Sequence, residues 1–138
     1  MPHAFVLRRR VHFYETDAAG IVHFSTFFRY MEEAEHALWR AAGMSIDSVS
    51  STYKWPRVSA AFDFKRPLRF EDEFEVHVGL ATVSTRTIQY NHTIMRGDIT
   101  VGVGTVTAAC VQLDANHMLK AVEIPADVLG RLRAVIGT

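Results

Sequence analysis

One stretch of the chain, from Ser25 to Ala42, is the only long segment with the period of an α-helix. Its apolar residues recur every three or four positions, which places one stripe on a single helical face: Phe27, Met31, Ala34, Leu38 and Ala41. Gly43 follows the stripe, where a left-handed C-terminal cap is expected. A helix of this length extends about 27 Å. A chain with one long amphipathic helix must cover that apolar stripe with another kind of element.

Most of the remaining chain alternates between apolar and polar residues, which is the period of a half-buried strand. This alternation predicts strands at Ala4–Tyr14, Ala60–Lys65, Phe74–Leu80, Thr87–Ile94 and Ile99–Leu113. The phase of the last segment slips near Gly104, which predicts a bulge or bend. A short helix is expected at Ala126–Val135. The last four strands are joined by short links, so they should be antiparallel.

A strongly curved antiparallel sheet can cover a single helical stripe. The sequence therefore predicts an α+β fold, with one long helix wrapped by a five-stranded antiparallel sheet, as a single domain over residues 1–138. A small sheet of this kind leaves open edges, and pairing with a second copy covers them. We therefore expect a homo-oligomer, either a dimer or a tetramer.

Charge and composition narrow the classes of partner. The chain has 15 Lys+Arg and 15 Asp+Glu, so it lacks the basic field that nucleic-acid binding needs, and the run at residues 8–10 is interpreted as a solvated edge. No apolar run approaches the roughly 18 residues that span a membrane. The basic residues at the N-terminus follow the apolar stretch, the reverse of a secretory signal. Cys110 is the single cysteine, so no internal disulfide can form, and we expect a cytoplasmic protein with Cys110 in its core.

The segment Tyr14–Phe24 joins the first strand to the long helix and holds the best candidate for chemistry. Asp17 follows the strand, Gly20 allows a tight turn, and the helix start supplies unpaired backbone N–H groups. A carboxylate beside such a helix end can attack a carbonyl or activate water while an N–H group polarises the carbonyl oxygen. Asp17 is also explained as a turn or N-cap residue, and the residues alone leave both interpretations open.

The same segment resembles the signature of the hotdog-fold acyl-CoA thioesterases, and within them the 4-hydroxybenzoyl-CoA thioesterase branch. The resemblance is carried by Tyr14…Asp17-Ala18-Ala19-Gly20-Ile21-Val22-His23-Phe24…Phe28-Arg29-Tyr30-Met31-Glu32-Glu33-Ala34. Weaker matches at residues 64–72 and 119–127 extend it over nearly the whole chain. It implies a hotdog fold, hydrolysis of an acyl- or aroyl-CoA thioester, no metal or cofactor, and active sites at subunit interfaces.

The resemblance also implies roles for individual residues. The catalytic carboxylate falls on Asp17, as nucleophile or general base, and the backbone N–H that polarises the carbonyl falls on or near Phe24. The usual tyrosine there is Phe24 in this chain, so a hydroxyl is lost and the amide is kept. His23 either hydrogen-bonds substrate or water or is a structural side chain. Gly20 is assigned to substrate binding, and Glu15 receives no role.

Coenzyme A carries phosphates, so exposed basic residues are candidates for its binding. Arg86, at the expected hairpin between the third and fourth strands, is the first candidate. Arg66 is the second, and Arg69 and Arg96 follow it. A single arginine on an exposed edge is also commonly a solvated charge.

Other polar and aromatic side chains have structural interpretations as well. Three aromatic residues either line an acyl pocket or pack in the core: Trp39, Trp55 and Phe27. Four histidines lack the spacing of a metal site and are expected at the surface or in an interface: His12, His36, His77 and His92.

Two other functions stay open at this point. A hotdog hydratase or dehydratase needs a histidine and a carboxylate that face each other across the dimer. A non-catalytic protein would bind an acyl thioester or an assembly partner without turnover. The resemblance favours the hydrolase.

Overall fold

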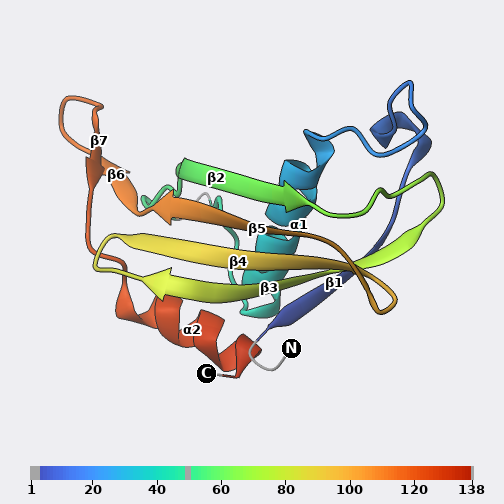
Figure 1. The fold of residues 1–138 in the computed structure, drawn as a ribbon. Helices are drawn as coiled ribbons and strands as arrows, with labels where there is room; N and C mark the ends of the chain where they lie inside the picture. Colours follow the sequence, from blue (N-terminus) through green and yellow to red (C-terminus); the bar gives the residue numbers. More distant parts are fainter. Residues whose placement is uncertain (1–3, 49–50, 138) are drawn as a thin grey trace.

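The computed structural model describes residues 4–48 and 51–137 (Figure 1). Within these residues the main sheet contains five strands, β1 (Phe5–Arg10), β2 (Arg57–Phe64), β3 (Glu73–Val83), β4 (Thr87–Arg96) and β5 (Ile99–Ala109). The long helix is α1 (Thr26–Ala41), and α2 (Ala126–Ile136) lies near the C-terminus. A short 3-10 turn, η1 (Phe13–Glu15), follows β1, and β6 (Val111–Leu113) pairs with β7 (Leu119–Ala121).

The strands of the main sheet lie in the order β1-β3-β4-β5-β2, and each neighbouring pair is antiparallel. α1 crosses one face of this sheet and packs mainly against β3 (Figure 1). α2 lies on the β3 side of the molecule and contacts α1. This arrangement confirms the expected hotdog fold, in which an antiparallel sheet wraps one long helix. It leaves β1 and β2 as the two edge strands.

The inward face of α1 forms the centre of the core. Tyr30, Ala34 and Leu38 are fully buried and belong to one apolar cluster with the inward residues of β3 and β4. Removing this apolar surface from water, at roughly 25 cal/mol per Å², stabilises the contact between helix and sheet. Ala41, expected on the same stripe, is exposed, because the helix ends there and the chain turns away at Gly43, which has φ 79°.

The first strand is shorter than the sequence predicts. Alternation predicts a strand that continues to Tyr14, but β1 ends at Arg10 and a 3-10 turn follows. Glu15 is the cause, because its carboxylate accepts the His12 backbone N–H at 2.8 Å and its own N–H donates to the His12 carbonyl at 3.0 Å. These two bonds close a capped turn where strand pairing would otherwise continue.

The sequence predicts a bulge or bend near Gly104, and the structure has a register shift in β5 three residues earlier. Gly104 pairs in register with His92 of β4 and Phe62 of β2, and the pairing between β4 and β5 slips at Val101 instead. A Cβ on Gly104 would lie 2.7 Å from the Met31 sulfur and from the Phe62 ring. The glycine therefore marks a close approach of side chains to the strand.

The predicted strand at 99–113 is divided into two. β5 ends at Ala109, and the remaining residues form β6, which pairs with β7 in a separate hairpin. Cys110 lies between them, where its N–H donates to the Arg86 carbonyl and its own carbonyl accepts the Val122 N–H. Strands of three residues are too short to show a period, so the sequence does not predict this hairpin.

An arginine and a histidine that the sequence predicts at the surface have side chains that lie in the interior of the protein. Arg9 belongs to the predicted solvated run, but its side chain is only 15% exposed, whereas Arg8 and Arg10 are exposed. His92, expected at the surface or in an interface, is 2% exposed, and its Nε2 lies 2.8 Å from Glu35 Oε2. Both residues occupy the inward face of their strands, and in each case a buried carboxylate faces them.

Two further expectations concern the core and the membrane. Cys110 is buried in the apolar cluster, as expected, and burial raises the pKa of its thiol. No helix in the described residues is long and apolar enough to cross a membrane.

Candidate active site

The loop at residues 16–24 connects η1 to α1 and is folded back on itself. Its two arms form an isolated antiparallel bridge, and the Asp17 N–H donates to the Ile21 carbonyl at 2.8 Å. At the tip, the Gly20 N–H donates to the Asp17 carbonyl at 2.9 Å, and Gly20 has φ 79°. A Cβ at Gly20 would meet no atom within 4 Å, so the backbone conformation, and not lack of space, favours glycine.

Asp17 is half-buried at this turn. Its Oδ1 accepts the Ala19 N–H at 2.9 Å, which fixes the carboxylate over the turn. Across the described residues, no ion pair includes Asp17. The carboxylate is therefore ordered by one backbone bond and keeps its other oxygen available to a ligand.

The start of α1 leaves the backbone N–H of Phe24 available in the loop that carries Asp17. The N–H groups around it are occupied: His23 donates to the Glu15 carbonyl at 2.9 Å, Ser25 donates to His23 Nδ1 at 3.2 Å, and Thr26 donates to the His23 carbonyl at 2.9 Å. The N–H of Phe24 has no partner among the residues that the structure describes. A free N–H at a helix start can accept the negative charge that develops on a carbonyl oxygen.

The side chains of His23 and Phe24 lie beside each other at this helix start. Their rings are 4.6 Å apart between centroids, and Phe24 is 63% exposed. His23 Nδ1 is engaged by the Ser25 hydroxyl at 2.8 Å, so Nε2 is the ring atom left to meet a ligand. The geometry thus gives His23 a structural contact without removing its second nitrogen from solvent.

A cavity of about 420 Å³ opens at the loop. Asp17 and Phe24 line it together with Phe27 and Phe64, whose rings pack edge to face at 5.5 Å. Two cations, Lys65 and Arg66, also line it. An apolar wall, one carboxylate and adjacent positive charge suit a ligand with an acyl group and an anionic tail.

The three arginines that lie near this loop and were predicted as candidates for phosphate binding have different environments. Arg66 is exposed at the cavity, next to Lys65, which the sequence analysis did not single out. Arg96 Nη1 donates to the Pro67 carbonyl at 2.8 Å and lies 3.5 Å from Asp72, so it secures the turn after β2. Arg69 is exposed on that same turn.

Arg86 lies at the opposite end of the sheet from Asp17. The β1 end that leads into the Asp17 loop pairs with the start of β3, whereas Arg86 follows the end of β3 (Figure 1). The eleven residues of β3 span roughly 35 Å at the usual rise of a strand. Arg86 is exposed, and its carbonyl accepts the Cys110 N–H at 2.8 Å. One copy of the chain therefore does not bring Arg86 and Asp17 together.

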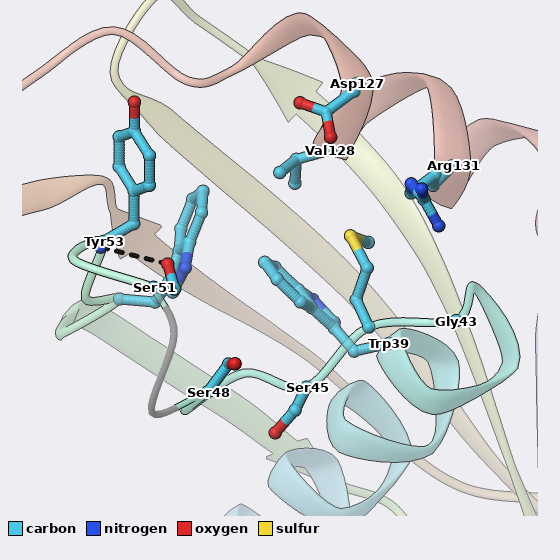
Figure 2. Close-up of a pocket in the computed structure, with 11 residues that line it drawn as sticks. Trp39, Gly43, Ser45, Ser48, Ser51, Tyr53, Asp127, Val128 and Arg131 are labelled. Atoms are coloured by element: carbon cyan, nitrogen blue, oxygen red, sulfur yellow. Dashed lines mark hydrogen bonds between the residues drawn. The ribbon is translucent and has the colours of Figure 1, made fainter.

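A second cavity, of about 310 Å³, lies at the other end of α1 (Figure 2). Trp39 and Trp55, expected in an acyl pocket or in the core, line this cavity and pack edge to face at 5.0 Å. The Trp39 indole N–H donates to the Tyr90 hydroxyl at 2.9 Å, so its polar group points into the protein. Of the three predicted aromatic residues, only Phe27 lies at the Asp17 cavity.

Glu15, which received no role from the sequence, is the centre of a buried network beneath the loop. Its carboxylate is 6% exposed and accepts four donors: both terminal nitrogens of Arg9 at 2.8 and 2.6 Å, the Tyr30 hydroxyl at 2.9 Å and the His12 N–H at 2.8 Å. We call Arg9, Glu15, Tyr30 and the His12 N–H the Glu15 cluster. Arg9 also donates to Glu33, outside this cluster, at 2.9 and 3.0 Å. The signal in the sequence that could have indicated this cluster is the alternation of β1, which places Arg9 on the inward face.

The protonation of the Glu15 cluster follows from these contacts. Burial alone would raise the pKa of Glu15, but the hydrogen bonds from Arg9, His12 and Tyr30 together lower it below 4.5. Burial and the bond to Glu15 raise the pKa of Tyr30. The cluster therefore holds a carboxylate, a guanidinium and a neutral phenol.

A second buried carboxylate, Glu35, faces the β2 side of α1. Glu35 is fully buried, its Oε1 accepts from Arg57 of β2, and His92 Nε2 is within ion-pair distance of Oε2 without hydrogen-bond alignment. Arg57 also donates to the Trp55 carbonyl at 2.9 Å. We call Glu35, Arg57 and His92 the Glu35 cluster. It lies beneath a groove of about 380 Å³ between α1 and β2.

Known proteins are similar to this chain in sequence and in structure. Residues 11–132 match the family model of the thioesterase-like superfamily. A solved hypothetical protein from Aquifex aeolicus is similar at 36% identity and a TM-score of 0.86, over 93% of this chain and 98% of that one. A 1,4-dihydroxy-2-naphthoyl-CoA hydrolase from Parasynechococcus marenigrum is 39% identical over 85 residues, 55% of this chain and 56% of that protein. A 4-hydroxybenzoyl-CoA thioesterase variant, solved with 4-hydroxybenzoyl-CoA, shares the fold at a TM-score of 0.84 and 18% identity, over 94% and 99% of the two chains.

Proposed function

The chain belongs to the thioesterase-like superfamily and is a thioester hydrolase, and from that premise we propose that it hydrolyses an acyl- or aroyl-CoA to the free acid and coenzyme A, with Asp17 as nucleophile or general base. The observation that carries the proposal is the cavity in which Asp17 and the start of α1 meet. Asp17 keeps an available carboxylate oxygen there, and Phe24 has a backbone N–H without a partner among the described residues.

The chemistry needs little more than these two groups. In one route, Asp17 attacks the thioester carbonyl, the C–S bond breaks, the thiolate of coenzyme A leaves, and water hydrolyses the resulting mixed anhydride. In the other, Asp17 takes a proton from the water that attacks the carbonyl. Both routes put negative charge on the carbonyl oxygen, and the Phe24 N–H at the helix start stabilises it. The apolar lining from Phe27 and Phe64 accommodates the acyl group.

The anionic half of the substrate requires cations at the rim of the cavity. Lys65 and Arg66 supply them within one chain. Arg86 joins them only if a second copy pairs along the open edge of β2, where Val58 and Phe64 are exposed. Antiparallel pairing of β2 with its copy reverses the partner's sheet, so the partner's β3–β4 hairpin comes to the same end as Asp17. We expect the active form to be a homodimer or a larger assembly for this reason.

Turnover of a panel of acyl-CoA and acyl carrier protein thioesters, followed by thiol release, tests the activity. Asp17→Asn should fold and associate normally but lose at least about tenfold in kcat, roughly 1.4 kcal/mol of barrier, because the amide keeps the shape without a nucleophilic oxygen. Asp98→Asn, at the exposed β4–β5 turn, is the charge-matched control and should retain its rate. Release from no thioester would contradict the hydrolase and favour a binding protein.

A hydratase or dehydratase is the alternative within enzymes. Two histidine–carboxylate pairs lie within ion-pair distance in the described residues. His92 and Glu35 are buried away from solvent, and His77 lies 3.1 Å from Glu75 on β3. Neither pair lines the cavity at Asp17. Formation of a hydrated or dehydrated acyl-CoA without thiol release would favour that alternative.

The role of Arg86 has its own test. Arg86→Ala should raise the KM for CoA thioesters several-fold with kcat nearly unchanged, because a phosphate contact remote from the thioester acts on binding. The effect should shrink at high salt, where exposed charges are already screened. A short thioester without the nucleotide is the control, and an equal loss with it would assign Arg86 to the fold. If neither substrate is affected, Arg66→Ala becomes the next variant.

A further inference from the structure

We infer that Glu15 is a positioning residue for the hydrolysis proposed above: its buried carboxylate fixes the Asp17 loop to β1 and α1, and so sets the place of Asp17 relative to the Phe24 N–H. The inference rests on the proposed function of Asp17. It assigns a catalytic effect to a side chain that does not itself line the cavity.

The contacts of Glu15 reach both arms of the loop. Its side chain is anchored to β1 through Arg9 and to α1 through Tyr30, and both of these elements contribute residues to the apolar core. Its carbonyl accepts the N–H of His23 on the returning arm at 2.9 Å. Asp17 follows Glu15 by two residues, and Phe24 follows His23 directly. One residue therefore joins the nucleophile's arm and the amide's arm to the same fixed point.

The hydrogen bonds to the Glu15 carboxylate are strong and directional enough to fix the position of the Asp17 loop. Both carboxylate oxygens accept bonds from the Arg9 guanidinium in a paired arrangement, which fixes direction as well as distance. The guanidinium in turn lies over the Tyr30 ring, 5.0 Å from its centroid. The remaining donors, His12 N–H and Tyr30 hydroxyl, are neutral and both reach Oε1.

Arg9 does not need Glu15 to balance its positive charge. Arg9 is already paired through two bonds with Glu33, which is 41% exposed and lies on the solvent side of α1. A second, buried carboxylate on the same guanidinium adds desolvation cost. We attribute the presence of this costly carboxylate to its role in the loop, because Glu15, unlike Glu33, is joined to the loop.

The test compares two substitutions on the same arginine. Glu15→Gln keeps the size of the side chain but presents an amide N–H₂ to the Arg9 donors, and it should lower kcat at least about tenfold while KM stays within about twofold. Glu33→Gln removes the other carboxylate from Arg9 without touching the loop, and its kcat should stay within about twofold. A role in stability alone would lower the melting temperature of Glu15→Gln and leave kcat per folded enzyme unchanged, which would overturn the inference.

Amide hydrogen exchange supplies a readout that does not depend on activity. The N–H groups of Asp17, Gly20 and His23 close the loop, and they should exchange faster in Glu15→Gln than in wild type while the central strands keep their rates. Unchanged loop exchange would overturn the inference, as would a higher KM with unchanged kcat. If Glu15→Gln does not fold, Tyr30→Phe replaces it, with an expected three- to fivefold loss of kcat, and a wild-type kcat would again overturn the inference. Full activity in Asp17→Asn would instead show that the proposed function is wrong.

Discussion

The Glu15 cluster and the Glu35 cluster each enclose a carboxylate beside α1, and they hold it in different ways. Glu15 accepts two bonds from a cation and two from neutral donors, three of them at Oε1 and one at Oε2. Glu35 accepts from the Arg57 cation, and its second oxygen faces His92 without hydrogen-bond alignment. The first carboxylate is satisfied by several groups, whereas the second depends chiefly on one.

The two clusters also connect α1 to different parts of the molecule. The Glu15 cluster joins the helix to β1 and to the loop that carries Asp17. The Glu35 cluster joins it to β2, the strand at the open edge of the sheet. Buried ion pairs therefore occur at two places in this fold. One lies beside the candidate active site, and the other lies behind β2, the edge strand that is available to a second copy. Loss of the cation should therefore cost less stability in the first cluster than in the second.

The largest effect is expected for Arg57→Met. The substitution leaves Glu35, which has no solvent exposure, without its cation, and a lone buried charge of this kind costs about 3–5 kcal/mol. The free energy of unfolding from urea denaturation at neutral pH measures it. The double variant Glu35→Leu/Arg57→Met removes both charges and should recover most of the loss. A loss below about 1 kcal/mol in Arg57→Met would mean that Glu35 does not depend on its cation and would contradict the comparison.

Arg9→Met should cost less, about 2 kcal/mol, because Glu15 keeps the bonds from His12 and Tyr30. The bonds between Arg9 and the half-exposed Glu33 add little to this value. The same denaturation experiment measures the difference between the two arginines. A cost equal to that of Arg57→Met would show that the neutral donors do not support Glu15 once the cation is gone.

The acid limb of the stability curve should report Glu15 directly. Its pKa is lowered in the folded protein from 4.5, so its contribution is fully present above about 4.5 and is lost as the pH falls through the folded value. Glu15→Gln has no such group and should lose stability less steeply on acidification, by up to about 1.4 kcal/mol per pH unit. Urea denaturation at several pH values between 3 and 6 measures both slopes. Parallel curves would contradict the hydrogen-bonded carboxylate.

The sequence predicted the parts of the fold that have a clear period. The α1 stripe and the alternation of β3 and β4 indicate one helix under an antiparallel sheet, and the motif around Asp17 indicates the loop that carries the candidate site. Alternation also grouped His92 with Ile88, Tyr90 and Ile94, which are all buried, so the inward position of His92 was readable. Its partner was not, because Glu35 comes from an element 57 residues away in the chain.

The remaining differences depend on contacts between distant segments. β1 ends early because Glu15 turns inward to Arg9 and closes a turn on His12, and local propensity does not contain that contact. Gly104 disturbs the pattern because Met31 and Phe62 approach it, although Gly104 itself pairs in register with His92. The separation of Arg86 from Asp17 follows from the antiparallel pairing of β1 with β3, which no single motif encodes.

The smallest effect is expected for Tyr30→Phe, which removes one neutral donor from the Glu15 cluster. Glu15 Oε1 keeps the bonds from Arg9 and His12, and the phenylalanine ring still packs against Phe74 and under the guanidinium. No buried donor is left unpaired, so the loss should be about 1 kcal/mol in the free energy of unfolding, the worth of one hydrogen bond. Urea denaturation beside Arg9→Met measures the two contributions on one scale. If Tyr30→Phe cost as much as Arg9→Met, the neutral phenol would support Glu15 as strongly as the cation does, and the contrast with the cation-dependent Glu35 would be sharper than proposed.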